Sequence, residues 1–162
     1  MNVVDTSFKP TGQNSVIKPL VLSHGTLECR NMKETRKFYE EFLGLECVRH
    51  AQPAMHARCG MKFSIVCVEV GDNVRPMNVL NHWGLDLESR EAVDAAYQAA
   101  VEMKDKYKIG EITKPTMRHG IYSFYLSDLD GNYWEIEYYD GSVHEDAFDF
   151  GDRFTMDGEP IE

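Results

Sequence analysis

Basic charge is scarce in this sequence. Only 17 Lys and Arg residues stand against 27 Asp and Glu residues, which leaves a formal net charge of −10. Nucleic acids and anionic membranes both require a basic face on their protein partner, so we expect neither to bind. The acidic charge is concentrated at one end, because Asp140–Glu162 holds eight acidic residues and one arginine. We therefore expect an acidic C-terminal tail over 141–162.

Long apolar runs and paired cysteines are also missing. No stretch approaches the roughly 20 apolar residues that cross a bilayer, and the first residues lack the basic start and apolar run of a signal peptide. The four cysteines form no CxxC pair, which argues against a zinc ribbon. We expect a cytoplasmic protein with free thiols. Hydrophobic residues make up 43% of the 162-residue chain, enough for the core of one ordinary domain.

A repeat runs through the chain with an offset of 58 residues. Val21–Glu28 resembles Val79–Asp86, and His24 and His82 occupy the same place in the two copies. Apolar residues alternate after each histidine, which indicates a strand in both copies. The residues before the repeat, 1–18, are expected to form an irregular arm.

Each of these strands is expected to lead into a helix and three more strands. Asn31 and Ser89 are the expected N-caps of the two helices, and apolar residues recur after them at helical spacing. The remaining strands are expected at 46–50, 57–59, 62–70, 111–113, 120–127 and 133–139. The predicted fold class is α+β, with two βαβββ modules in tandem over about 19–75 and 77–140 that form a single domain, 19–140.

Two histidines and a carboxylate form a candidate metal site. Duplicated modules usually pack about a pseudo-twofold axis, so His24 and His82 can meet near it. Glu135 and Glu137 lie two residues apart on the last expected strand and therefore share one face, and a buried carboxylate needs a partner. Two imidazoles and one carboxylate are the facial triad typical of non-haem Fe(II), which keeps positions open for substrate and oxygen.

The motifs around these residues resemble those of the vicinal oxygen chelate superfamily. This superfamily includes glyoxalase I, extradiol ring-cleaving dioxygenases, fosfomycin-resistance enzymes and bleomycin-resistance proteins. The resemblance covers roughly residues 18–140 and is carried by L-S-H at 22–24, F-Y-x3-L-G-L at 38–45, L-N-H-W-G-L at 80–85 and S-D-L-D-G-N-Y-W-E at 127–135. It implies a cupped mixed sheet around a metal ion held by His24, His82 and Glu135, because the family's glutamate is usually the fourth residue after the turn glycine.

Two alternatives concern the ligands. Some dioxygenases of the family carry a W-E-x-E-Y sequence in which the second glutamate binds, and that residue is Glu137 here. Glyoxalase-like isomerases take a fourth ligand from the last strand of the first module. In this chain the aligned position falls near Val66 or Cys67, and Glu69 stands slightly too late. The missing glutamate favours three protein ligands.

The segment R-H-G at 118–120 resembles a stretch of the extradiol dioxygenases that precedes a strand ending in tyrosine. The resemblance implies that His119 and Tyr125 are catalytic residues lining the substrate pocket. A histidine exchanges protons near neutral pH, and a tyrosine hydroxyl can donate to a substrate oxygen. A further catalytic histidine could be His50 or His56, which the sequence does not separate.

Three functions follow from the resemblance. The first is an extradiol-type dioxygenase that acts on a catechol-like small molecule through one divalent metal ion, with Fe(II) or Mn(II) favoured over Zn or Ni. The second is a glyoxalase-like lyase or isomerase, or a thiol transferase, that uses the metal as a Lewis acid. The third is a metal-free small-molecule binding protein of the antibiotic-resistance kind. The exposed edges of two short modules predict a homodimer.

Overall fold

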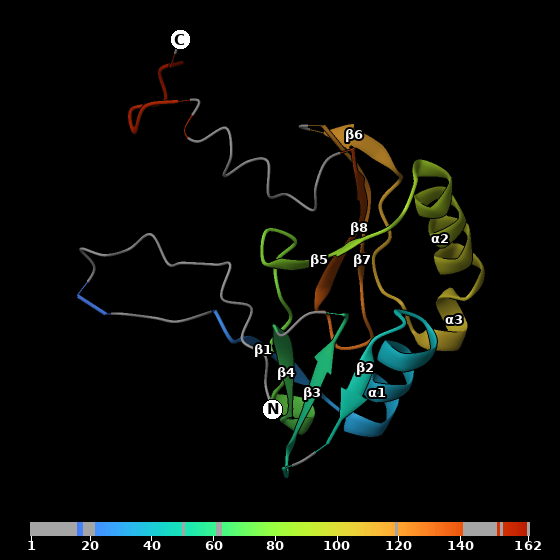
Figure 1. Ribbon diagram of the computed structural model, residues 1–162. Helices are drawn as coiled ribbons and strands as arrows, with labels where there is room; N and C mark the ends of the chain where they lie inside the picture. The colour runs from blue at the N-terminus through green and yellow to red at the C-terminus, as the bar shows by residue number, and fades with distance from the viewer. Residues whose placement is uncertain are drawn as a thin grey trace. The chain divides into compact units, whose positions relative to one another are not determined.

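The computed structural model describes residues 16–17, 22–49, 51–60, 63–118, 120–140, 152 and 154–161. The chain divides into two compact units with their boundary between Asp72 and Asn73. Among the described residues, no helix is both long and apolar enough to cross a bilayer. Figure 1 labels the strands and α-helices, and the elements are β1 (His24–Cys29), α1 (Met32–Glu41), β2 (Glu46–Val48), β3 (Ala54–Arg58), β4 (Ser64–Glu69), the 3-10 turn η1 (Gly71–Asn73), β5 (His82–Asp86), α2 (Arg90–Glu102), α3 (Lys104–Tyr107), β6 (Thr116–Arg118), β7 (Ile121–Ser127) and β8 (Tyr133–Tyr139).

Each unit contains one four-stranded sheet with the same topology. The strand order is β1-β4-β3-β2 in the first unit and β5-β8-β7-β6 in the second. The first and last strands of each unit pair in parallel, and the other neighbours pair antiparallel. A parallel pair needs a crossover connection, which α1 and α2 provide. The predicted α+β fold with two βαβββ modules is confirmed.

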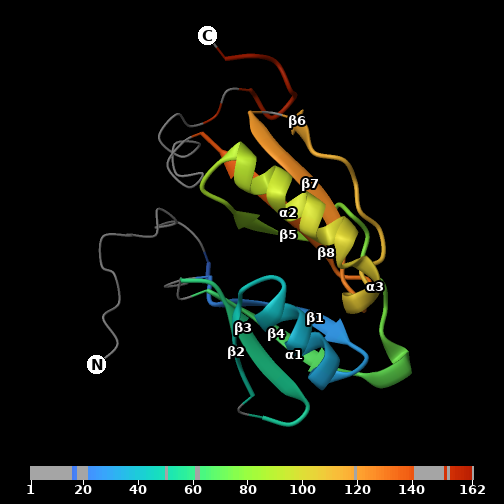
Figure 2. The same ribbon diagram turned by 90° about the vertical axis from the view of Figure 1, so that its right-hand side faces the viewer.

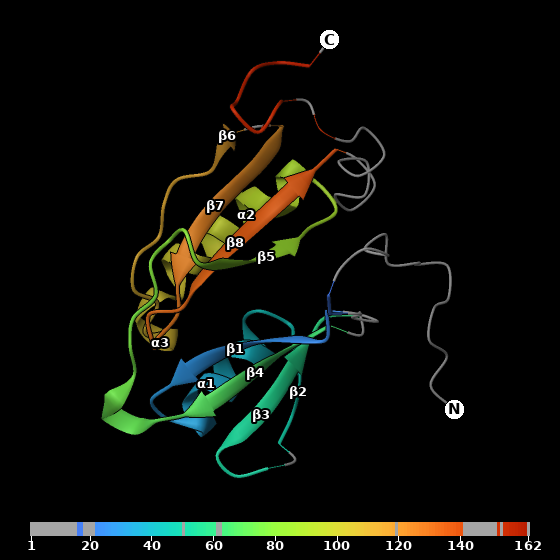
Figure 3. The same cartoon turned by 90° about the vertical axis from the view of Figure 1, so that its left-hand side faces the viewer.

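One face of each sheet is covered by the helix of its own unit. Figure 2 shows α1 and α2 in front of their respective sheets, and Figure 3, from the opposite side, shows the strands in front of the helices. The side chains between sheet and helix form the core of each unit, as in the ring contact between Tyr97 of α2 and Phe124 of β7. Because neighbouring side chains on a strand alternate between faces, the opposite face of each sheet is left for other groups.

Helix α1 begins where the sequence predicts, and a glutamate from another strand completes its N-terminus. The side chain of Asn31 accepts hydrogen bonds from the backbone N–H groups of Lys33 and Glu34. The N–H of Met32 donates instead to Oε2 of Glu69, with an N–O distance of 2.6 Å. Helix N-termini leave such N–H groups without partners inside the helix, so Glu69 acts as a second cap that ties β4 to α1.

The strand predicted at 111–113 is wrong in position. This segment lies beside β7 without forming a regular strand: Thr113 N–H donates to Tyr125 O at 2.8 Å, and Ile112 forms an isolated bridge with Leu126. Pro115 then interrupts the segment, because proline lacks an N–H and restricts the residue before it. The edge strand forms after the proline, as β6.

The turn between β7 and β8 closes an antiparallel hairpin. Its carboxylate, Asp128, accepts from the backbone N–H groups of Asp130 and Asn132 and from the indole of Trp134. Burial raises the pKa of Asp128 to about 6, and the backbone hydrogen bonds oppose that shift. Gly131 has a φ of 84°, which favours glycine, and any Cβ there would lie 3.1 Å from Pro76. The turn therefore sets where β8 begins.

Candidate metal centre

The candidate ligands of the second unit lie on the sheet face that α2 does not cover. Phe124 packs against α2, so its neighbours Ser123 and Tyr125 point to the other face of β7. The register places Glu135 of β8 opposite Tyr125 on one side and opposite Gly84 of β5 on the other. Strand pairing thus gathers side chains from three strands on one face.

His82 and Glu135 face each other across β5 and β8. Nε2 of His82 lies 3.0 Å from Oε2 of Glu135. Nδ1 of His82 lies 2.6 Å from the carbonyl oxygen of Val79, and a carbonyl can only accept, so Nδ1 carries the proton. The space between Nε2 and the carboxylate then requires either a second proton or a metal ion. An imidazole oriented by a carbonyl and paired with a carboxylate is a donor set that fits a divalent metal.

Two hydroxyl groups also hold the carboxylate of Glu135, which is only 9% exposed. Oγ of Ser123 donates to Oε1 of Glu135 at 2.6 Å. Burial, followed by a hydrogen bond to Glu135, raises the pKa of Tyr125 to about 12. Tyr125 also meets the ring of His82 edge-on, with 5.0 Å between the ring centroids. Tyr125 is therefore a protonated group directly beside the His82–Glu135 pair.

Glu137 shares this face but not the contact with His82. Its side chain lies over Gly84, because a Cβ at Gly84 would come within 2.6 Å of Oε1 of Glu137. Glu137 is 6% exposed, so it is as buried as Glu135. Of the two glutamates that the sequence leaves open, the structure brings Glu135 to His82.

The first unit has no carboxylate at the place corresponding to Glu135. His24 pairs with Ser64 at the start of β4, and Val66 lies two residues farther along that strand. In the second unit, Glu135 holds the corresponding position, two residues beyond the register partner of His82. Val66 is therefore the counterpart of Glu135, and its side chain cannot bind a metal ion.

His24 is exposed at the start of β1, where its Nδ1 lies 2.9 Å from Oγ of Ser23. His56 of β3 occupies the place in the first sheet that Tyr125 has in the second. Nδ1 of His56 lies 2.9 Å from Oγ of Ser64, and Ser64 is the register partner of His24. Of the two further candidate histidines, His56 shares the sheet face of His24.

The two side chains considered as a fourth ligand point to the other face. Cys67 is fully buried, and it alternates with Val66 on β4, which directs it toward α1. Glu69 lies on the same side as Cys67, and its carboxylate is bound to the N–H of Met32. Glu69 thus caps α1 and Cys67 lies in the core of the first unit, and the set of three protein ligands stays a prediction.

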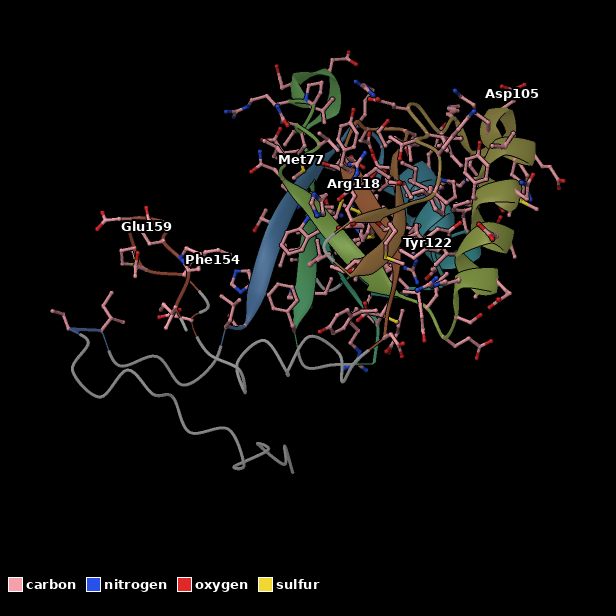
Figure 4. The ribbon with its side chains drawn as sticks, turned by 90° about the horizontal axis from the view of Figure 1, so that it is seen from above. Met77, Asp105, Arg118, Tyr122, Phe154 and Glu159 are labelled. Atoms are coloured by element: carbon pink, nitrogen blue, oxygen red, sulfur yellow. The ribbon has the colours of Figure 1, made fainter. Side chains whose placement is uncertain are left out.

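Tyr122 belongs to the helix-covered face rather than to the site. Its hydroxyl donates to Oδ1 of Asp94 on α2 at 2.8 Å, and Figure 4 shows it beside that helix. The guanidinium of Arg90 lies 5.9 Å from the centre of its ring. Tyr122 therefore ties β7 to α2, which leaves Tyr125 as the β7 tyrosine at the His82–Glu135 pair.

Not every predicted residue is placed by the structure. His119 and His50 lie outside the described residues. Over the described ranges, no three His, Cys, Asp or Glu side chains gather as a metal site, and the second unit supplies two of the three predicted ligands. That His24 binds the same metal ion as His82 and Glu135 stays a prediction.

Sequence reasoning missed two groups that hold the pair in place, Ser123 and the carbonyl of Val79. Ser123 has the same strand alternation as Tyr125, which is a signal that could have found it. The carbonyl of Val79 belongs to the backbone, so no residue type reveals it.

Comparison with known proteins shows the superfamily of the chain and the fold that it shares with solved structures. The model of the Glyoxalase/Bleomycin resistance protein/Dioxygenase superfamily matches residues 21–136. A search of curated proteins found no matching sequence. Solved structures share the fold. The fosfomycin resistance protein FosX from Listeria monocytogenes has a TM-score of 0.60 and 20% identity, over 79% of this chain and 98% of that one. A possible glyoxalase from Bacillus cereus has a TM-score of 0.58 and 24% identity, over 73% of this chain and 98% of that one. At such identities the likeness shows the fold alone.

Proposed function

The chain belongs to the glyoxalase/bleomycin resistance protein/dioxygenase superfamily, and from this premise we propose that it is an enzyme with one divalent metal ion held by His24, His82 and Glu135. Members of this superfamily typically use a divalent metal. The observation that carries the proposal is the 3.0 Å contact between Nε2 of His82 and Oε2 of Glu135. With Nδ1 held by a backbone carbonyl, the imidazole directs its ligand atom toward that carboxylate.

The proposed site has three protein ligands rather than four. Val66 stands where a second carboxylate would be needed, and Glu69 is engaged as a helix cap. Three protein ligands leave several positions of an octahedral metal open. Such a site can accept two adjacent oxygen atoms of one small molecule.

We propose ring-cleaving oxygen chemistry of the extradiol type on a catechol-like substrate, with Fe(II) or Mn(II) as the metal. When bound, the metal would supply Lewis acidity that lowers the pKa of the two substrate hydroxyls. The chain's own groups would orient the substrate. Tyr125 is protonated and lies against His82, and its hydroxyl would turn from Glu135 to donate to a substrate oxygen. His119 is the proposed proton-transfer group.

The first experiment is metal analysis of protein that is purified anaerobically and offered a mixed panel of divalent ions. We expect about one Fe or Mn per chain, followed by oxygen uptake with some member of a catechol panel. Glu135→Gln should lose the metal. Glu137→Gln is the matched control, because it changes a carboxylate on the same strand and face, and it should keep the metal.

Other outcomes lead to other functions. A preference for Zn or Ni, with turnover of a hemithioacetal and no oxygen uptake, would establish Lewis-acid lyase or isomerase chemistry instead. If wild-type protein takes up no ion from the panel, the proposal is wrong and a metal-free binding protein becomes the better account. Loss of metal in Glu137→Gln alone would exchange the roles of the two glutamates. The proposed homodimer is tested by light scattering on the same samples.

A further inference from the structure

A buried serine divides the two oxygens of Glu135 between different tasks. Ser123 is 2% exposed and belongs to β7, where the register places it opposite Glu137. Its hydroxyl nevertheless reaches diagonally to Oε1 of Glu135, at 2.6 Å. A carboxylate can only accept, so the serine O–H is the donor. The other oxygen, Oε2, is the one that faces Nε2 of His82.

This arrangement affects how a metal ion would be bound. A carboxylate can bind a metal through one oxygen or through both. With Oε1 committed to Ser123 and Oε2 directed at His82, Glu135 offers one oxygen only. One-oxygen binding keeps a further metal position open for a small molecule. Rotation of the carboxylate away from this orientation would break the 2.6 Å hydrogen bond from Ser123, so the hydroxyl favours the orientation in which Oε2 alone faces His82.

We propose that Ser123 is a positioning residue that holds Glu135 as a one-oxygen metal ligand. The proposal rests on the proposed metal site and adds a residue to it. Hydrogen-bond partners of metal ligands generally change metal affinity by about 10–100-fold when they are removed. We therefore expect the dissociation constant for Mn(II) to rise by about that factor when the hydroxyl of Ser123 is removed.

The experiment measures Mn(II) binding to the full chain from the electron paramagnetic resonance signal of free Mn(II). Ser123→Ala removes the hydroxyl. Ser123→Thr and Ser123→Val form a second pair that differs only in whether a hydroxyl or a methyl group is present. This pair keeps the test decisive if Ser123→Ala does not fold. Infrared difference spectra on adding Mn(II) report whether the carboxylate binds through one oxygen or two.

The matched control is Ser127→Ala, a buried serine on the same strand and face. Oγ of Ser127 accepts from the N–H of Glu111 at 2.8 Å and has no part in holding Glu135. Ser127→Ala should therefore lower the melting temperature and leave the Mn(II) affinity at the wild-type value. If Ser123 had a purely structural role, Ser123→Ala would likewise lower the melting temperature and leave the Mn(II) affinity unchanged.

The outcomes separate this inference from the proposed function. The positioning role is supported if Mn(II) binding is weakened in Ser123→Ala and Ser123→Val and recovers in Ser123→Thr. The infrared spectra of Ser123→Ala and Ser123→Val should then show a carboxylate that binds through two oxygens. Wild-type affinity in every Ser123 variant overturns it and leaves the metal site intact. Absence of Mn(II) binding in the wild type overturns the proposed metal site and this inference together.

Discussion

Replacing Glu69 with alanine is expected to destabilise the first unit and to leave metal binding unchanged. Oε2 of Glu69 accepts a 2.6 Å hydrogen bond from the N–H of Met32, the first residue of α1. The side chain of Asn31 serves the next two N–H groups of the helix. Without Glu69, the N–H of Met32 loses its acceptor at a partly buried position.

The size of the effect follows from two contributions. A hydrogen bond to a charged group contributes about 1.5–3 kcal/mol, and a carboxylate at a helix N-terminus adds about 0.3–1 kcal/mol. Because Glu69 is partly exposed, we expect a loss near the lower end, about 2 kcal/mol. For a chain of this size that corresponds to a fall of about 4–8 °C in Tm. Glu69→Gln keeps an oxygen acceptor and should lose about half as much.

The assay combines thermal unfolding, followed by circular dichroism, with Mn(II) affinity of the same proteins. A Tm for Glu69→Ala equal to that of the wild type would show that the cap contributes nothing. A tenfold or greater loss of Mn(II) affinity in Glu69→Ala would refute the reasoning more deeply. It would make Glu69 a fourth ligand and would favour the lyase or isomerase reading of the site.

Three further predictions concern Gly84, Cys47 and Cys59. Gly84→Ala should cost about 1 kcal/mol, near the lower end for overpacking, because its Cβ would lie 2.6 Å from Oε1 of Glu137 and the end of that flexible side chain can move aside. Urea unfolding should show no such cost in a Glu137→Ala background, and an equal cost there would contradict the contact. Burial raises the pKa of Cys47 to about 11 from 9.0. The thiol therefore ionises in the unfolded chain first, and the free energy of unfolding should fall between pH 9 and 11, by at most about 3 kcal/mol. Cys47→Ala should flatten this pH dependence, and an unchanged slope would refute the assignment. In a thiol-reagent assay of the native protein, exposed Cys59 should react alone and quickly, with all four cysteines reacting only after unfolding.

Much of the fold could be predicted because its signals are local. Asn31 and Ser89 accept helix N–H groups as expected, and β8 spans Tyr133–Tyr139 as predicted. Capping depends on a few neighbouring residues, and strand alternation is visible in the sequence itself. The edge strand was misplaced because Pro115 moved the pairing to β6, and an edge strand has only one neighbour to specify its position.

The sequence by itself determined the superfamily and the two repeated modules and suggested the residue types of the candidate site, because these depend on short motifs and their spacing. Only the tertiary structure decided which glutamate meets His82, since Glu135 and Glu137 share a strand and a face. It also placed Ser123 against Glu135 and directed Glu69 to a helix end. The physical reason is that strand register and side-chain direction belong to pairs of segments far apart in the chain, and no single segment encodes them.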